Sequence, residues 1–218
     1  MNDSNDISLA DALSGCAYSV RKSDLEKAAR LMAAAFHDDP SIRYLLGGRT
    51  QGRDDWRYFL AVLRALYGRC VMLAGGEAMK SLLILFPPRL KSVPALGFML
   101  NGGLGLAGRF GLPLFRRSIN YEGNCQRVRN GFTTPETWYC MCFVVSPEAQ
   151  GRGLGSKLIR PVLDILDAHG APLYLETHKE INTRIYMHLG FETADVSAIP
   201  DTDIKQYAML RRPRGMGA

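Results

Sequence analysis

One stretch of the sequence, residues 140–158, constrains the fold of this chain more than any other. It reads as an apolar strand, a short loop, a glycine-rich turn and the start of an amphipathic helix. Gly151, Gly153 and Gly155 let the backbone approach a ligand without a Cβ in the way. The first turn of the following helix leaves N–H groups without partners at the positive end of the helix dipole. The stretch therefore predicts a main-chain binding site for a diphosphate.

The composition indicates a single globular domain with reduced thiols. A chain of 218 residues with 47% hydrophobic residues can bury a sizeable core. Its five cysteines are an odd number without a Cys-x-x-Cys pair, which predicts neither a disulfide framework nor a metal site and favours a cytoplasmic location. Cys140 and Cys142 alternate along the predicted strand, so we expect them to share one face as small buried hydrophobic residues.

Charge and hydropathy exclude several partners. The net charge of +6 suits an anionic ligand, but the basic residues are scattered and predict no nucleic-acid partner. The N-terminus lacks the basic start and apolar stretch of a secretory signal. Residues 93–115 are rich in Gly and Leu, but Pro94, Asn101 and Arg109 interrupt them, so no membrane partner is predicted. We expect a flexible or helical surface element there, a candidate roof for a substrate cleft or a homodimer interface.

The periodicity of the apolar residues predicts a mixed order of strands and helices. Expected helices span 25–36, 56–67, 155–169 and 182–189. Pro161 falls inside the third, where we expect a kink or a local partner for the carbonyl of Lys157 that it frees. Strands are expected at 16–22, 70–74, 79–86, 138–145, 173–177, 191–197 and 205–210. The order predicts an α/β or α+β sandwich around one sheet. We expect a single domain over 16–212, with an N-terminal tail at 1–15 and a C-terminal tail at 213–218.

Two motifs in this order resemble the signatures of the GCN5-related N-acetyltransferase (GNAT) family. The family's phosphate-binding signature is Gln/Arg-x-x-Gly-x-Gly/Ala, and Gln150, Gly153 and Gly155 fill it. The later signature, an Asn, a Tyr and then Gly-Phe, is filled by Asn182, Tyr186 and residues 190–191. A closer likeness is to the puromycin N-acetyltransferase branch, carried by short matches at residues 33–40, 138, 145–156, 161 and 175–177. Residues 87–135 match no family pattern.

The resemblance implies a fold and a reaction. The fold is an α/β (α+β) GNAT fold: a mixed, mostly antiparallel sheet of about seven strands flanked by helices, splayed between the fourth and fifth strands. The reaction is direct transfer of an acetyl group from acetyl-CoA to the primary amine of a small molecule in a ternary complex, without a metal. The residues that the resemblance assigns to the cofactor are Phe143, Val144, Val145, Gln150, Gly151, Arg152, Gly153, Leu154, Gly155, Ser156 and Asn182. Arg152 and Lys157 are cations near the diphosphate site, and an N–H of the strand edge at 143–145 would stabilise the thioester oxygen.

The resemblance also implies the catalytic residues. Tyr186 is the candidate general acid, because a phenol can protonate the departing thiolate. Glu176 is the candidate base, and His178 is the alternative. Asp38 and Asp39 are alternative contacts for a cationic acceptor. Each residue also has a purely structural interpretation: Tyr186 as a core aromatic, Glu176 as a strand-end salt bridge, and the aspartates as a turn.

Two other functions stay open. A protein or peptide N-acetyltransferase would need an open groove for its acceptor. A CoA-binding sensor on the same fold would bind the cofactor without turnover, although Tyr186 argues against that alternative.

Overall fold

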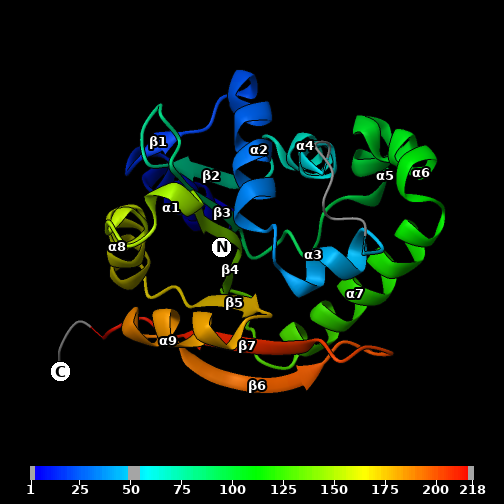
Figure 1. The fold of residues 1–218 in the computed structure, drawn as a ribbon. Coiled ribbons are helices and arrows are strands. Elements are labelled where there is room, and N and C mark those ends of the chain that lie inside the picture. The colour runs from blue at the N-terminus through cyan, green and yellow to red at the C-terminus, as the bar shows by residue number, and fades with distance from the viewer. Residues whose placement is uncertain (1–2, 49–54, 216–218) are drawn as a thin grey trace.

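A seven-stranded sheet forms the centre of the molecule, in the order β1-β2-β3-β4-β5-β7-β6 (Figure 1). The structure is a computed structural model that describes residues 3–48 and 55–215. The strands are β1 (Tyr18–Ser19), β2 (Val71–Ala74), β3 (Ser81–Phe86), β4 (Trp138–Val145), β5 (Leu173–Thr177), β6 (Glu192–Ala198) and β7 (Lys205–Arg211). Neighbouring strands are antiparallel except β4 and β5, which are parallel. The predicted mixed, mostly antiparallel sheet is confirmed.

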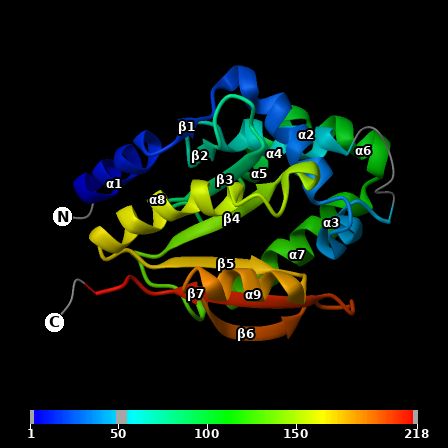
Figure 2. The same cartoon turned by 60° about the vertical axis from the view of Figure 1, so that its left-hand side comes forward.

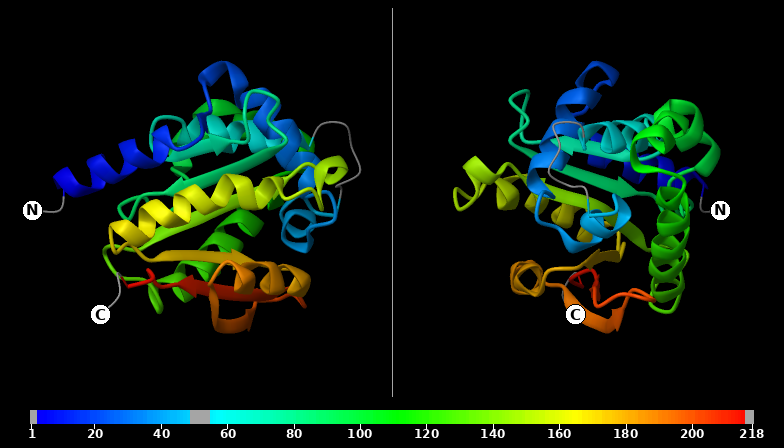
Figure 3. Two further views of the ribbon diagram at one scale, coloured as in Figure 1. Left: turned by 90° about the vertical axis from the view of Figure 1, so that its left-hand side faces the viewer. Right: turned by 45° about the vertical axis from the view of Figure 1, so that its right-hand side comes forward.

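Helices cover both faces of this sheet. They are α1 (Asp3–Gly15), α2 (Leu25–Ala35), α3 (Pro40–Leu45), α4 (Trp56–Leu66), α5 (Ala95–Phe98), α6 (Leu104–Phe110), α7 (Pro113–Asn130), α8 (Leu154–Ala168) and α9 (Glu180–His188). Short 3-10 turns span Lys22–Asp24 and Pro147–Ala149, and a π-helical turn spans Met99–Gly103. Helices α1 and α8 pack on one face, where α9 also lies (Figures 2 and 3). Helices α2 and α4 cover β2–β4 on the other face, and α7 packs against β5 and β7 there.

The helices and strands that carry the two signatures form where the sequence predicts them. Strands β4 and β5 have the predicted bounds, and α8 and α9 differ from the expected helices by one or two residues at their ends. Pro161 lies inside α8. The expected strand at 16–22 is reduced to two paired residues in β1.

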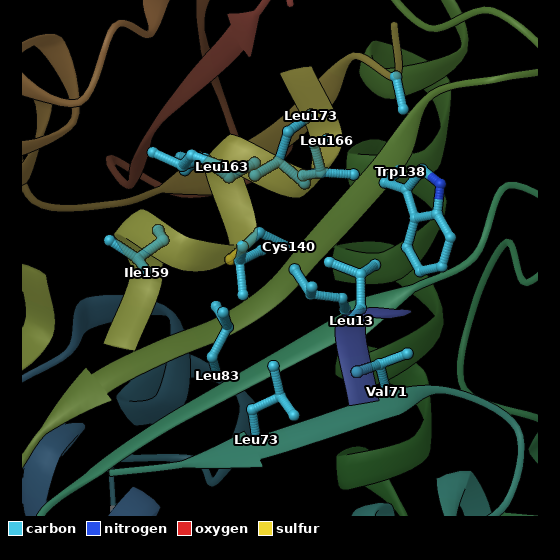
Figure 4. Close-up of a cluster of buried hydrophobic side chains, with 14 of the residues drawn as sticks. Leu13, Val71, Leu73, Leu83, Trp138, Cys140, Ile159, Leu163, Leu166 and Leu173 are labelled. Atoms are coloured by element: carbon cyan, nitrogen blue, oxygen red, sulfur yellow. The ribbon is translucent and has the colours of Figure 1, made fainter. Parts of the chain in front are cut away.

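The N-terminal segment differs from the expected tail. Residues 3–15 form α1, and Leu9 and Leu13 are buried in the same cluster as the apolar side of α8 (Figure 4). Asp, Asn and Ser make up much of this segment. Its two leucines lie four residues apart on one helical face, which is too weak an apolar pattern to predict a helix. Of the expected C-terminal tail, residues 216–218 lie outside the described residues.

A β-bulge in β4 reverses the expectation for its two cysteines. Ile84 and Leu85 of β3 are consecutive, yet they pair with Cys142 and Cys140, so Met141 is an extra residue. Cys140 therefore packs on the α8 face and Cys142 on the α2–α4 face. The prediction that they share a face is wrong, because strand alternation assumes an uninterrupted ladder. Both are buried, as expected.

The parallel pair β4–β5 separates along its length. Trp138 to Cys140 pair with Leu173 to Leu175, and the register ends there. On its other side β4 stays paired with β3 as far as Val145, opposite Ser81. This arrangement is consistent with the predicted splay, and it leaves the β5 side of residues 141–145 outside the ladder.

The segment at 93–115 is helical and exposes apolar side chains. Leu96, Leu100, Leu104 and Leu112 are each at least 60% exposed. At the bend between α5 and α6, Gly102 has a φ of 118° and the Asn101 amide donates to Gly97 O. Within the described ranges, no helix is long and apolar enough to cross a membrane.

Candidate active site

A cavity of about 690 Å³ opens where β4 and β5 separate. Its lining combines the end of β4, the glycine loop, the start of α8 and one side of α9, together with the end of α2. Ten of the eleven expected cofactor residues line it: Phe143, Val144, Val145, Gln150, Gly151, Gly153, Leu154, Gly155, Ser156 and Asn182. Tyr186 lines it too, whereas Arg152 and Glu176 do not. The structure thus brings residues of both signatures to one cavity.

The glycine loop presents backbone to the cavity. Gly151 and Gly153 have φ values of 74° and 73°, a left-handed conformation that favours glycine. A Cβ at either position would meet nothing within 4 Å, so both face open space. Gly153 is the N-cap of α8, whose first bond runs from Lys157 N to Gly153 O, so the N–H groups of residues 154–156 have no helical acceptor. The loop therefore offers donors and the positive end of a fifteen-residue helix to an anion.

Gly155 has a different role from the two left-handed glycines. A Cβ there would lie 3.1 Å from Phe143 Cζ and 3.2 Å from Val145 Cγ2. Its missing side chain lets α8 approach the end of β4 closely. The Gln150 amide donates to Val145 O at 3.4 Å, which joins the loop to the same strand end. Through this bond the Gln150 side chain helps to hold the turn against the end of β4.

Tyr186 and Asn182 both project from α9 into the cavity lining. The Tyr186 ring packs against Phe143 and Phe191, with centroids 6.5 and 5.7 Å apart. Burial raises the pKa of Tyr186, so its phenol stays protonated and can donate at neutral pH. The Asn182 amide donates to Thr177 Oγ1 at 3.0 Å, which fixes α9 to the end of β5.

The Glu176 side chain lies on the face of the sheet that α7 covers and does not line the cavity. Its side chain is 3% exposed, and Tyr139 Oη donates to Oε2 at 2.6 Å. Arg129 Nη1, from α7, lies 3.9 Å from Oε1. Burial raises the pKa of Glu176 although Arg129 opposes the shift. The expected base is therefore a buried carboxyl between an arginine and a tyrosine.

Asp39 lines the cavity, whereas His178, the alternative base, does not. Burial lowers the pKa of His178 against the opposing charge of Asp39, so its imidazole is neutral at pH 7. His178 Nε2 lies 3.5 Å from Tyr121 Oη. Asp39 lines the cavity, but its Oδ1 accepts from the N–H groups of Ser41 and Ile42 and so caps α3. Asp38 is exposed and close to His37.

Sequence reasoning missed several lining residues. Arg160 lies one helical turn after Ser156 on the same side of α8, a spacing that would have indicated it. Lys179 adds a second cation. Ile181 and Ile185 are 60% and 54% exposed, yet they line the cavity from α9, so they offer apolar contact to a ligand. The described residues contain no group of three or more His, Cys, Asp or Glu side chains suited to a metal ion.

Comparisons with solved structures define the class of fold. A histone acetyltransferase HPA2-related protein from Corynebacterium glutamicum superposes with a TM-score of 0.56 at 16% identity, over 92% of this chain and 97% of that one. Arylalkylamine N-acetyltransferase 2 from Aedes aegypti also gives 0.56, at 12% identity, over 90% of this chain and 97% of that one. At such identities the likeness establishes the fold, which is the acetyltransferase fold of the GNAT family.

Sequence comparison agrees with the fold. Residues 118–191 match the model of the acetyltransferase (GNAT) family, and this range contains both signatures. An uncharacterized N-acetyltransferase of Schizosaccharomyces pombe is 44% identical over 55 residues, which are 25% of this chain and 22% of that protein. The match thus spans about a fifth of the yeast protein. Residues 118–191 therefore carry a sequence similarity to the GNAT acetyltransferase family, and the fold of the whole chain agrees with it.

Proposed function

We propose that this protein transfers the acetyl group of acetyl-CoA directly to a primary amine of a small molecule, in a ternary complex. The observation that carries the proposal is the cavity at the β4–β5 separation, where the glycine loop and Tyr186 meet. In this proposal the N–H groups of residues 151–156 bind the diphosphate, and Arg160 and Lys179 add positive charge. Arg152 and Lys157 lie near the same loop without lining the cavity, so in this proposal they add a weaker attraction for the diphosphate.

The end of β4 supplies the next component of the proposed reaction. Residues 143–145 lie beyond the last pair with β5, so their edge is available to the pantetheine arm as to an added strand. One of their N–H groups would stabilise negative charge on the thioester oxygen. The exposed apolar side chains of Ile181 and Ile185 flank this path.

The proposed reaction needs two proton transfers, one to the departing thiolate and one from the acceptor amine. Tyr186 donates to the thiolate as CoA leaves. For the amine, Glu176 is retained as a base that acts through water, because its side chain does not line the cavity. His178 is the alternative, and its neutral imidazole is ready to accept a proton. Glu176→Gln and His178→Gln separate them: the variant of the true base loses the rise of kcat/KM with pH.

The proposal is tested first by cofactor binding. Acetyl-CoA and CoA at millimolar concentration should each raise the melting temperature of the protein, because a ligand that binds only the folded state stabilises it. No shift with either compound would contradict the proposal. Release of free CoA with a panel of amines, compared with a panel of peptides, then separates small-molecule transfer from protein acetylation. Binding without CoA release for any acceptor would favour a sensor.

Finer features remain part of the proposal. The likeness to the puromycin N-acetyltransferase branch concerns residues 138, 145–156 and 175–177 and suggests a small amine as acceptor. A cytoplasmic location rests on the free cysteines. A homodimer would use the exposed leucines of residues 96–112.

A further inference from the structure

One acidic side chain lines the cavity at the β4–β5 separation. Among the described residues of the lining, Asp39 carries the single carboxylate, whereas Arg160 and Lys179 carry positive charge. Asp39 enters from the turn between α2 and α3, and the two cations come from α8 and from the start of α9. In Figure 1 the lower end of α2 lies above the separated strands and α9 lies below them. The cavity therefore meets one negative charge on its α2 side.

The two carboxylate oxygens of Asp39 differ in their hydrogen bonds. Oδ1 accepts from the N–H groups of Ser41 and Ile42 at 2.9 and 3.3 Å, and from the Ser41 hydroxyl. Within residues 3–48 and 55–215, Oδ2 accepts from no donor, and it is not one of the enclosed unpaired atoms. Asp39 is only 6% exposed, so water compensates this oxygen poorly. Oδ2 is therefore open to a donor that enters the cavity.

The surroundings hold Asp39 in place before any ligand binds. The three bonds to Oδ1 cap α3 and fix the orientation of the carboxylate, so Oδ2 needs no rearrangement to meet a donor. Ala35 and Phe36, at the end of α2, line the cavity on the same side. The Phe36 ring stacks on Phe59, with centroids 5.8 Å apart. The fixed carboxylate thus adjoins an apolar surface that suits the carbon skeleton of a small molecule.

The charge of Asp39 acts on the groups proposed for proton transfer. Burial raises the pKa of Tyr186, and Cys140, Cys142 and Asp39 add to the rise. Burial lowers the pKa of His178, and Asp39 opposes that shift. Asp39 therefore lies within electrostatic reach of both the proposed acid and the alternative base.

We propose that Asp39 Oδ2 binds the acceptor amine as its ammonium, so that the acceptor is a basic aliphatic amine rather than an aromatic one. This inference rests on the proposed function and names the acceptor class for the same site. An alkylammonium is fully charged at neutral pH and donates a charge-assisted hydrogen bond to Oδ2. One proton then passes from its nitrogen to the proposed base. The neutral amine keeps an N–H bond to Oδ2 while its lone pair attacks the thioester carbon.

The test compares amines with alcohols of the same shape on the CoA-saturated protein at neutral pH. The probes are 1-aminohexane against 1-hexanol, and 2-phenylethylamine against 2-phenylethanol, with dissociation constants from calorimetry. The wild-type protein should bind at least one amine about 10-fold more tightly than its alcohol, the usual size of a charge-assisted contact. Asp39→Asn should abolish this preference. Its amide oxygen can still cap α3, but it has no charge and places an N–H donor where Oδ2 was.

The control is Asp38→Asn, which removes an equal charge from the neighbouring side chain. Asp38 is 84% exposed and does not line the cavity, so this variant should keep the preference. No amine preference in the wild-type protein, or an undiminished one in Asp39→Asn, would overturn the assignment. So would an equal loss of amine and alcohol binding in Asp39→Asn, since that indicates a structural role. A melting shift with CoA, measured on every variant, tests the proposed function separately.

Discussion

At the scale of single residues, two side chains of the same type differ in hydrogen bonding and burial according to their surroundings. Tyr186 lines a cavity with a protonated phenol. Tyr139 instead donates a hydrogen bond to the buried Glu176, and its ring packs against the guanidinium of Arg129. Glu122 is partly open and Glu176 is enclosed, although both lie beside Arg129.

Replacing Tyr186 with Phe should lower turnover and leave acetyl-CoA affinity nearly unchanged. The proposed proton donor is lost, while the ring that packs on Phe143 and Phe191 is kept. General acid catalysis contributes about 10²- to 10⁴-fold, so kcat should fall by that order. Steady-state kinetics with calorimetric binding of acetyl-CoA measures both quantities. Wild-type turnover in the Tyr186→Phe protein would remove the residue as acid.

The titration of Glu122 should make the free energy of unfolding depend on pH. Because its pKa is raised from 4.5 to about 7 in the folded state, the folded protein binds more protons than the unfolded chain between these values. Its contribution to stability is therefore greatest at low pH and declines as the pH rises to about 7. Glu122→Gln should become more stable relative to wild type over this interval, as measured by urea unfolding at several pH values. A pH-independent difference would contradict the shift.

At the scale of helices and strands, α8 has two functional ends. Its N-terminus presents N–H groups to the cavity. Near its C-terminus, Asp167 accepts from both terminal nitrogens of Arg211 at 2.6 Å, and the Arg211 Nε donates to Leu189 O at 3.1 Å. This contact joins α8 to β7 and to the residue after α9, so the orientation of the proposed diphosphate site depends on it.

Substitution of the two left-handed glycines that flank α8 should separate strain from binding. Gly153 and Gly170 have φ values of 73° and 63°, and a Cβ at either would meet nothing within 4 Å. Gly153→Val and Gly170→Val should both lose about 1–2 kcal/mol of stability from the left-handed backbone. Only Gly153→Val should also lose CoA binding, because its side chain projects into the proposed diphosphate site. Tight CoA binding by Gly153→Val would place the diphosphate elsewhere.

Breaking the Asp167–Arg211 pair should destabilise the fold in a pH-dependent way. Asp167→Asn leaves a nearly buried guanidinium without its carboxylate, at a cost of about 3 kcal/mol. Hydrogen bonds from Arg211 lower the pKa of Asp167, so the wild-type contribution is complete above the unfolded pKa and is lost as the pH falls through the folded value. Chemical unfolding at neutral and acidic pH should show the two proteins converging in acid. A constant gap would argue against the ion pair.

At the scale of the whole molecule, one core layer depends on the N-terminal helix. Leu13 is fully buried between β2, β4 and α8 (Figure 4). Leu13→Ala should therefore reduce the free energy of unfolding by about 2–5 kcal/mol, as expected for a cavity in a packed core. Asp11→Ala, two residues earlier and exposed on the same helix, is the control and should change it little. Equal stability of the two variants would indicate that α1 is dispensable.

The sequence predicted the signature elements well because their information is local. Strand β4 is a continuous apolar run with clear ends, and the glycine pattern fixes where α8 begins. The contact of Glu176 with Arg129 could not be predicted from the sequence, because Arg129 comes from a helix distant in the chain. The bulge at Met141 was equally hidden, since nothing in an apolar run marks an extra residue. Arg160 was predictable from helical spacing and was overlooked.

The extra residue in β4 also sets how this domain can tolerate change in length. Upstream of it Trp138 and Cys140 face α8, and downstream Phe143 again packs toward α8, although five positions separate the first from the last. Deleting Met141 would leave a regular ladder in which Cys140 and Cys142, already opposite the consecutive residues Leu85 and Ile84, keep their present faces. Strand β4 should therefore accept the loss of Met141, its extra residue in the pairing with β3, without an exchange of side chains between the two core layers.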